Sequence, residues 1–223
     1  MIHSATAPRG GGRRWLERFG IGLFELMLRP ERYLRRAVRR SADTLPWVLI
    51  SLVGLGGFMD NLSVRITFMQ AMGRTVDLES LQWISVWPGA LVLCLPLGAV
   101  AWLLWGWWYR VRLRFCGAKD VDKRQARLVW IHARSVAAVP MALWLVVTTV
   151  RYDNYLEAWS AGSLDITFLA LEAWAIFVGW RGAITCFPVN RTAALWWFLI
   201  VPIGFFGLLI AIGIGSVLVA MLI

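Results

Sequence analysis

Long apolar runs alternate with short polar segments along this chain. Five runs approach or exceed the about 20 residues that a helix needs to cross a bilayer core of about 30 Å. They cover residues 46–64, 84–109, 130–150, 164–180 and 195–223. Because an unpaired backbone is too costly in hydrocarbon, and no barrel-like alternation occurs, the pattern predicts five transmembrane helices. The fourth run is the shortest, and it contains an acidic residue, Glu172.

The region before the first run is polar and basic. Residues 1–12 are expected to form a flexible tail, and residues 13–45 a basic amphipathic region. Apolar residues recur every three or four positions between Arg13 and Leu28, and again after Pro30, a residue that suits the first turn of a helix. Arginines surround the second apolar stripe: Arg32, Arg35, Arg36, Arg39 and Arg40. We therefore predict amphipathic helices that lie at the membrane interface.

Composition agrees with this division. Hydrophobic residues make up 59% of the 223 positions and charged residues only 16%, whereas soluble domains average about half and about a quarter. Such apolar content excludes a disordered chain, and three cysteines are too few for a disulfide-stapled secreted scaffold. The fold class expected is all-α: a polytopic integral membrane protein whose residues 46–223 form a five-helix bundle.

The basic residues predict the orientation of the helices. Residues 1–45, 110–129 and 181–194 carry 19 lysines and arginines, whereas the alternate segments 65–83 and 151–163 carry three. Cytoplasmic loops are enriched in basic residues, so the N-terminus is predicted to be cytoplasmic and the C-terminus to lie on the opposite side. Many tryptophans also fall at the predicted ends of the spans, where an indole ring is favoured.

The net charge of +10 leaves two interpretations of the N-terminal arginines. They either serve only to enforce topology, or they also attract anionic lipid, with about 1 kcal/mol per basic residue near the surface. A nucleic-acid partner is not expected, because the membrane accounts for the charge and no base-stacking module is visible.

Few residues are candidates for chemistry within the spans. Glu172 is the acidic residue deepest in a run, and Arg134 in the third run is its obvious partner. The pair is either structural or part of a transport or proton-relay path. His132 lies near Arg134, but the other histidine, His3, is in the tail, so no metal site is expected. No catalytic motif occurs, and we expect neither enzymatic activity nor a cofactor.

Other features concern packing. Prolines interrupt three runs and predict kinks: Pro88, Pro96, Pro140 and Pro202. In the last run small residues recur on one face and predict close helix contact: Gly204, Gly207, Ala211 and Gly215. This face is either an internal packing surface or the seam of a dimer. The three cysteines are expected to be reduced and unpaired.

Three segments carry a resemblance to a known family. They are LFELMLRPERY at residues 23–33, RFCGAKDVDKRQARLVWIHARSVAAVP at 114–140 and GWRGAITCFPVNRTAALWWFLIVP at 179–202. With five spans and a cytoplasmic N-terminus, the chain resembles the Yip (Ypt-interacting protein) domain family over residues 23–223. The resemblance implies a compact five-helix membrane protein without known catalytic residues. Eukaryotic members work with Rab-type GTPases and membrane-shaping partners, but their acid-rich cytoplasmic region is replaced here by arginine.

Two functions are compatible with these observations. The first is a non-enzymatic membrane organiser or adaptor in a bacterial inner membrane, which binds anionic lipid or a membrane-protein partner through its basic cytoplasmic face. The second is a small transporter or lipid-translocating protein that uses Glu172 and Arg134 within the helix bundle.

Overall fold

The computed structural model describes residues 22–40, 45–74, 81–161, 165–205 and 207–208. Four helices in this part of the chain are long and apolar enough to cross a membrane. They are α3 (Leu45–Ala71), α4 (Trp83–Phe115), α5 (Lys123–Arg151) and α7 (Asp165–Cys186). Shorter elements flank them: α2 (Pro30–Arg40), α6 (Tyr155–Ser160), α8 (Arg191–Leu195) and the π-helix η2 (Trp196–Ile200).

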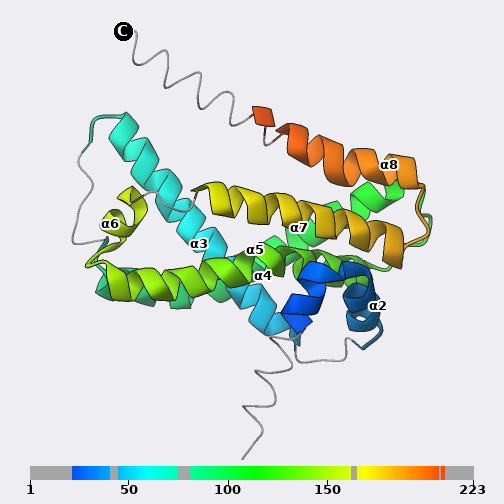
Figure 1. Ribbon diagram of the computed structural model, residues 1–223, viewed down its shortest axis with the longest axis horizontal. Coiled ribbons are helices and arrows are strands. Elements are labelled where there is room, and N and C mark those ends of the chain that lie inside the picture. The colour runs from blue at the N-terminus through cyan, green and yellow to red at the C-terminus, as the bar shows by residue number, and fades with distance from the viewer. Residues whose placement is uncertain (1–21, 41–44, 75–80, 162–164, 206, 209–223) are drawn as a thin grey trace, which may run out of the picture.

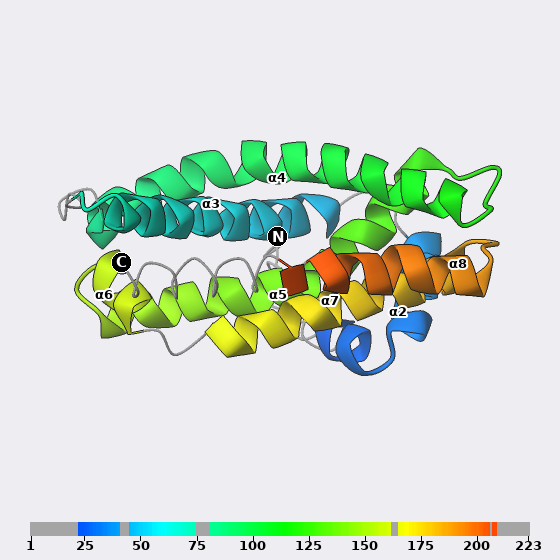
Figure 2. The same ribbon diagram turned by 90° about the horizontal axis from the view of Figure 1, so that it is seen from above.

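The long helices form two layers. Helices α3 and α4 lie against each other in one layer, and α5 and α7 form the second (Figures 1 and 2). Helix α5 also packs on α3 and α4, so it lies at the centre of the described bundle. Its residues 128–133 are all buried. Helix α2 packs across α7 and α5 near their ends.

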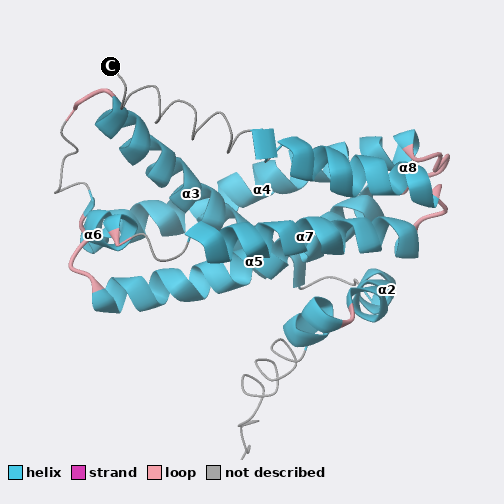
Figure 3. Ribbon diagram, turned by 45° about the horizontal axis from the view of Figure 1, so that its top comes forward, coloured by secondary structure: helices cyan, strands magenta, loops and turns pink. Residues whose placement is uncertain are grey.

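The loops between the long helices gather at the two ends of the bundle (Figure 3). At one end the α4–α5 turn meets the α7–α8 link, where the Asn190 amide donates to the Cys116 carbonyl oxygen at 2.8 Å. We call this end, with residues 22–40, 110–129 and 181–191, the basic end. At the opposite end the Trp83 indole donates to the Tyr152 carbonyl oxygen at 2.8 Å. The structure thus brings three of the most basic segments of the sequence together.

At the basic end a glycine turn follows the end of α4, and a side-chain cap begins α5. The Asp122 carboxylate accepts hydrogen bonds from the backbone amides of Arg124 and Gln125 at 3.3 and 3.0 Å, which caps the first turn of α5. Gly117 has a φ of 91°, a conformation that glycine adopts at least cost, so the chain reverses just after α4.

The helices are longer than the apolar runs that predict them. Helix α3 continues past residue 64 to Ala71, and α7 continues past residue 180 to Cys186. The predicted loop 110–129 was largely wrong, because α4 runs to Phe115 and α5 begins at Lys123. Hydropathy marks where the polar residues begin, but backbone hydrogen bonds and packing continue the helix beyond that point. Leu113, for example, is fully buried in this predicted loop.

Part of the predicted organisation lies outside the described residues. This holds for the tail at 1–12, for residues 13–21 of the first predicted helix, and for most of the fifth span. Residues Arg191–Phe205 form an apolar helix that is shorter than a membrane span within its described part. The fifth span therefore stays a prediction.

The closest helix contact is between α3 and α4, and the sequence did not reveal it. A Cβ atom placed on Gly54 would overlap the Cys94 carbonyl oxygen, and one on Gly98 would overlap the Ile50 carbonyl oxygen. The two backbones therefore touch at a pair of glycines. The predicted small-residue face makes no such contact in its described half, since a Cβ on Gly204 or Gly207 would meet nothing within 4 Å. Its other members, Ala211 and Gly215, lie outside the described residues.

Candidate functional site

An ion pair joins the middle of α5 to the middle of α7. The Arg134 guanidinium contacts the Glu172 carboxylate, and both side chains are partly buried, at 34% and 26% exposure. Arg134 lies eleven residues, about 17 Å, from the start of α5. Glu172 lies fourteen residues, about 21 Å, from the end of α7 at the same end of the bundle. The two residues predicted as partners therefore meet at similar depth, well inside their helices.

A third charged residue lies within electrostatic range of this pair. Asp60, on α3, interacts electrostatically with both Glu172 and Arg134. It lies about 22 Å from Leu45, the first residue of α3, and its side chain is exposed on the helix surface. The sequence placed Asp60 near the end of a span rather than with the other two. We call these three residues, Arg134 of α5, Glu172 of α7 and Asp60 of α3, the charged cluster.

His132 does not belong to this cluster. It is 3% exposed, and it packs edge to face with Tyr33 of α2 at 5.4 Å between ring centroids. The Tyr33 hydroxyl and the His132 Nδ1 atom are 3.5 Å apart, at the limit of a hydrogen bond. His132 therefore helps to hold α2 against α5, which is a packing role.

The apolar side of the N-terminal region faces protein. Leu26 and Leu34 are 1% and 0% exposed, and they belong to one core cluster with Val136 of α5 and Val178 of α7. Gly182 of α7 permits this contact, because a Cβ there would lie 3.1 Å from Leu34 Cδ1. The prediction of helices at the membrane interface is not confirmed, and Leu26 and Leu34 of this stripe are covered by α5 and α7.

The arginines of α2 lie outside this buried stripe. Arg32, Arg35 and Arg36 are exposed. The Arg36 guanidinium forms an ion pair with Glu25 at 2.6 Å, and Arg181 of α7 pairs with Glu31 of α2. Arg39 and Arg40 also belong to α2. Burial and the nearby Glu25 raise the pKa of Tyr33, so it stays neutral at physiological pH.

The described residues contain no group of three His, Cys, Asp or Glu side chains placed to hold a metal ion. The cysteines in that part of the chain, at positions 94, 116 and 186, are free thiols. The arrangement offers two kinds of chemistry: a charged cluster inside the helices, and exposed guanidinium groups at the basic end that can bind anions.

These features define a helical protein of the multi-pass membrane class, with one strongly basic end. Compared with protein-family models, curated proteins and solved structures, the chain gives no match. The resemblance to the Yip family therefore stays a prediction.

Proposed function

We propose that this protein is a non-enzymatic membrane organiser or adaptor, similar to the Yip family, that binds anionic lipid or a membrane partner through its basic end. The observation that carries the proposal is the docking of α2. Its apolar residue Leu34 is buried against α5 and α7, while its arginines at positions 32, 35 and 36 stay exposed at the basic end. A helix fixed in this way holds its charges at a constant position relative to the ends of α5 and α7.

Electrostatics support an anionic partner. Among the described residues, the opposite end has three arginines, at positions 65, 74 and 151. The basic end has six arginines within residues 29–40, together with the basic residues of the α4–α5 and α7–α8 connections. We propose that the basic end is cytoplasmic, in a bacterial inner membrane, because basic residues are retained on that side. Anionic lipid headgroups there attract basic side chains with about 1 kcal/mol each at low salt.

Lipid retention in nanodiscs tests the proposal. The full chain is reconstituted in equal parts of phosphatidylcholine and phosphatidylglycerol, and the lipids that remain bound are counted by native mass spectrometry. Replacement by Gln of five arginines should abolish the preference for phosphatidylglycerol: Arg32, Arg35, Arg36, Arg39 and Arg40. The matched control replaces Arg65, Arg74 and Arg151 at the opposite end and should keep the preference. An intact preference in the fivefold variant would reject lipid binding through α2.

A second candidate function follows from the charged cluster. Ionisable residues inside a membrane usually have a partner or a functional task. The contact between Arg134 and Glu172, with Asp60 in electrostatic range, favours a small transporter or lipid-translocating protein that uses these groups.

Flux measurements separate the two candidates. Liposomes that contain the protein are assayed for proton leak and for flipping of a fluorescent lipid. A transporter should lose its flux in Glu172→Gln and keep it in Glu157→Gln, which alters an exposed acid of α6 outside the four long helices. Equal rates in protein-free and protein-containing liposomes would reject transport of these species.

A further inference from the structure

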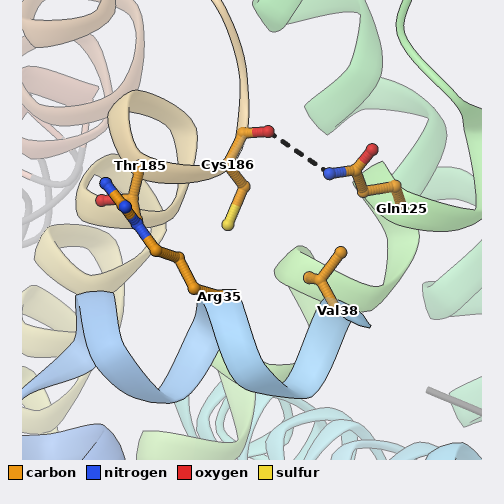
Figure 4. Close-up of a pocket in the computed structure, with 5 residues that line it drawn as sticks. All are labelled: Arg35, Val38, Gln125, Thr185 and Cys186. Carbon is orange, nitrogen blue, oxygen red and sulfur yellow. Dashed lines mark hydrogen bonds between the residues drawn. The ribbon is translucent and has the colours of Figure 1, made fainter. Parts of the chain in front are cut away.

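A cavity at the basic end lies where three elements meet. It has a volume of about 320 Å³ and is lined by Arg35 and Val38 of α2, Gln125 of α5, and Thr185 and Cys186 of α7 (Figure 4). This volume is near the lower end of the range for small-ligand pockets, about 300–1,000 Å³. The cavity exists because α2 is docked across the ends of α5 and α7.

The polar side chains of the cavity are hydrogen-bond donors. In Figure 4 the Arg35 side chain extends in the direction of Thr185, and both residues line the cavity. A hydrogen bond orients the Gln125 side chain: its Nε2 atom donates to the Cys186 carbonyl oxygen at 3.3 Å. The described residues that line the cavity include no carboxylate. A guanidinium, a hydroxyl and an amide without an acid form a donor set suited to an oxyanion.

Arg35 differs in its electrostatic surroundings from two other arginines of the basic end. Glu25 forms an ion pair with Arg36, and Glu31 forms one with Arg181. Within the described part of the chain, Arg35 makes no ion pair and no hydrogen bond. Among the described residues, no carboxylate forms an ion pair with the Arg35 guanidinium at the cavity.

The depth of the cavity suits a lipid headgroup. Thr185 and Cys186 are the last residues of α7, and Gln125 is the third residue of α5. The cavity thus lies at the ends of two of the long apolar helices, where the phosphates of a bilayer leaflet are found. Val38 supplies an apolar wall.

We propose that this cavity binds the phosphate group of an anionic phospholipid, with the Arg35 guanidinium on the phosphate oxygens and the Thr185 hydroxyl donating to one of them. The inference rests on the proposed function, because it names the site and the ligand of the basic end. It adds that one headgroup is held by directed hydrogen bonds, in addition to the diffuse attraction of the arginines. Directed contacts persist at salt concentrations that screen diffuse attraction.

The experiment counts the phosphatidylglycerol molecules that the full-length protein retains in equal parts of phosphatidylcholine and phosphatidylglycerol, at low and at high salt. Arg35→Gln and Thr185→Val are the test variants. Arg114→Gln is the matched control, because Arg114 is exposed at the same end and does not line the cavity. We expect the wild type and the control to retain one phosphatidylglycerol at high salt. The affinity should fall about tenfold or more in Arg35→Gln, which loses a charged hydrogen-bond donor.

Several outcomes would overturn the inference. If Arg35→Gln retains the high-salt lipid as the control does, the cavity is not the site, although a low-salt preference for anionic lipid would leave the proposed function intact. If the wild type shows no preference at either salt, both fail. Unchanged tryptophan fluorescence and thermal stability show that each variant is folded.

Titration of the detergent-solubilised protein with inorganic phosphate separates two sources of the ligand. Binding that is lost in Arg35→Gln would show that the cavity recognises the phosphate group itself, free or in a lipid. Lipid retention that depends on Arg35, without binding of free phosphate, would assign the site to the lipid headgroup. Absence of an Arg35-dependent effect in both measurements rejects the phosphate site.

Discussion

Replacing Gly54 by alanine tests the contact between the backbones of α3 and α4. A Cβ atom on Gly54 would overlap the Cys94 carbonyl oxygen and lie 2.5 Å from the Gly98 amide nitrogen. Both are backbone atoms, so no side-chain rotation can remove the overlap. The helices themselves must move apart.

The size of this movement sets the expected loss of stability. Ordinary Cβ contact begins at 3.4 Å, so the Gly98 nitrogen alone requires the helices to separate by about 0.9 Å, and the Cys94 oxygen requires more. A gap of that size removes about a quarter to a half of the dispersion energy at each affected contact, and overpacking in proteins typically costs about 1–3 kcal/mol. Alanine recovers about 1 kcal/mol through its higher helix propensity. We expect a net destabilisation of up to about 2 kcal/mol, and a loss of about 1–3 kcal/mol relative to a control that gains the helix propensity without the overlap.

Gly57→Ala provides the matched control on the same helix. A Cβ at Gly57 would meet nothing within 4 Å, so this substitution should leave stability unchanged or raise it by up to about 1 kcal/mol. The free energy of unfolding is measured by titration of micelle-solubilised protein with sodium dodecyl sulfate, followed by tryptophan fluorescence. If Gly54→Ala were as stable as Gly57→Ala, the close crossing of α3 and α4 would be refuted.

Three further predictions concern other parts of the molecule. Arg134→Met and Glu172→Met should each lower the free energy of unfolding in the same titration. The double variant should lose less stability than the sum of the two, with a coupling energy of about 1 kcal/mol or more. Additive losses would contradict the ion pair between these side chains. Burial raises the pKa of the Cys116 thiol from 9.0 to about 11, so its alkylation should be slow at neutral pH and accelerate toward pH 11. Because the unfolded thiol ionises first, Cys116 should also lower stability as the pH rises from 9 to 11, and a flat profile over that window would contradict its burial. In a chain with its native cysteines replaced, Asp153→Cys should react with an impermeant maleimide on intact cells, and Lys119→Cys only after permeabilisation; the reverse result would contradict the proposed orientation.

The existence of the long helices could be predicted because hydropathy reports directly on the energy of placing side chains in hydrocarbon. The partnership of Arg134 and Glu172 could also be predicted, since each is costly alone and few other charges lie in the runs. The ends of the helices could not, because hydrogen bonding and packing continue them beyond the apolar residues. Leu113 is buried in a segment whose arginines made it resemble a loop.

Contacts between helices were harder to predict. Gly54 and Gly98 belong to different helices, so no spacing in the sequence relates them. The predicted small-residue face rests instead on Gly207, Ala211 and Gly215, which recur every four residues in one run. The docking of α2 was missed for a similar reason. A stripe that contains Leu34 suits lipid and protein equally well, and only the positions of α5 and α7 determine that protein covers it.

Asp60 shows that the end of an apolar run does not give the position of a charge within its helix. The run ends at residue 64 and predicts a carboxylate near the interface, where water can hydrate it. Helix α3 continues to Ala71, so Asp60 lies about 17 Å from that end and about 22 Å from the other. Arg134 is already in contact with Glu172, and the cluster therefore has one carboxylate more than it has guanidinium groups. One proton or one cation would balance that charge, so the transporter candidate predicts that Asp60→Asn changes the proton flux through protein-containing liposomes without altering lipid retention at the basic end.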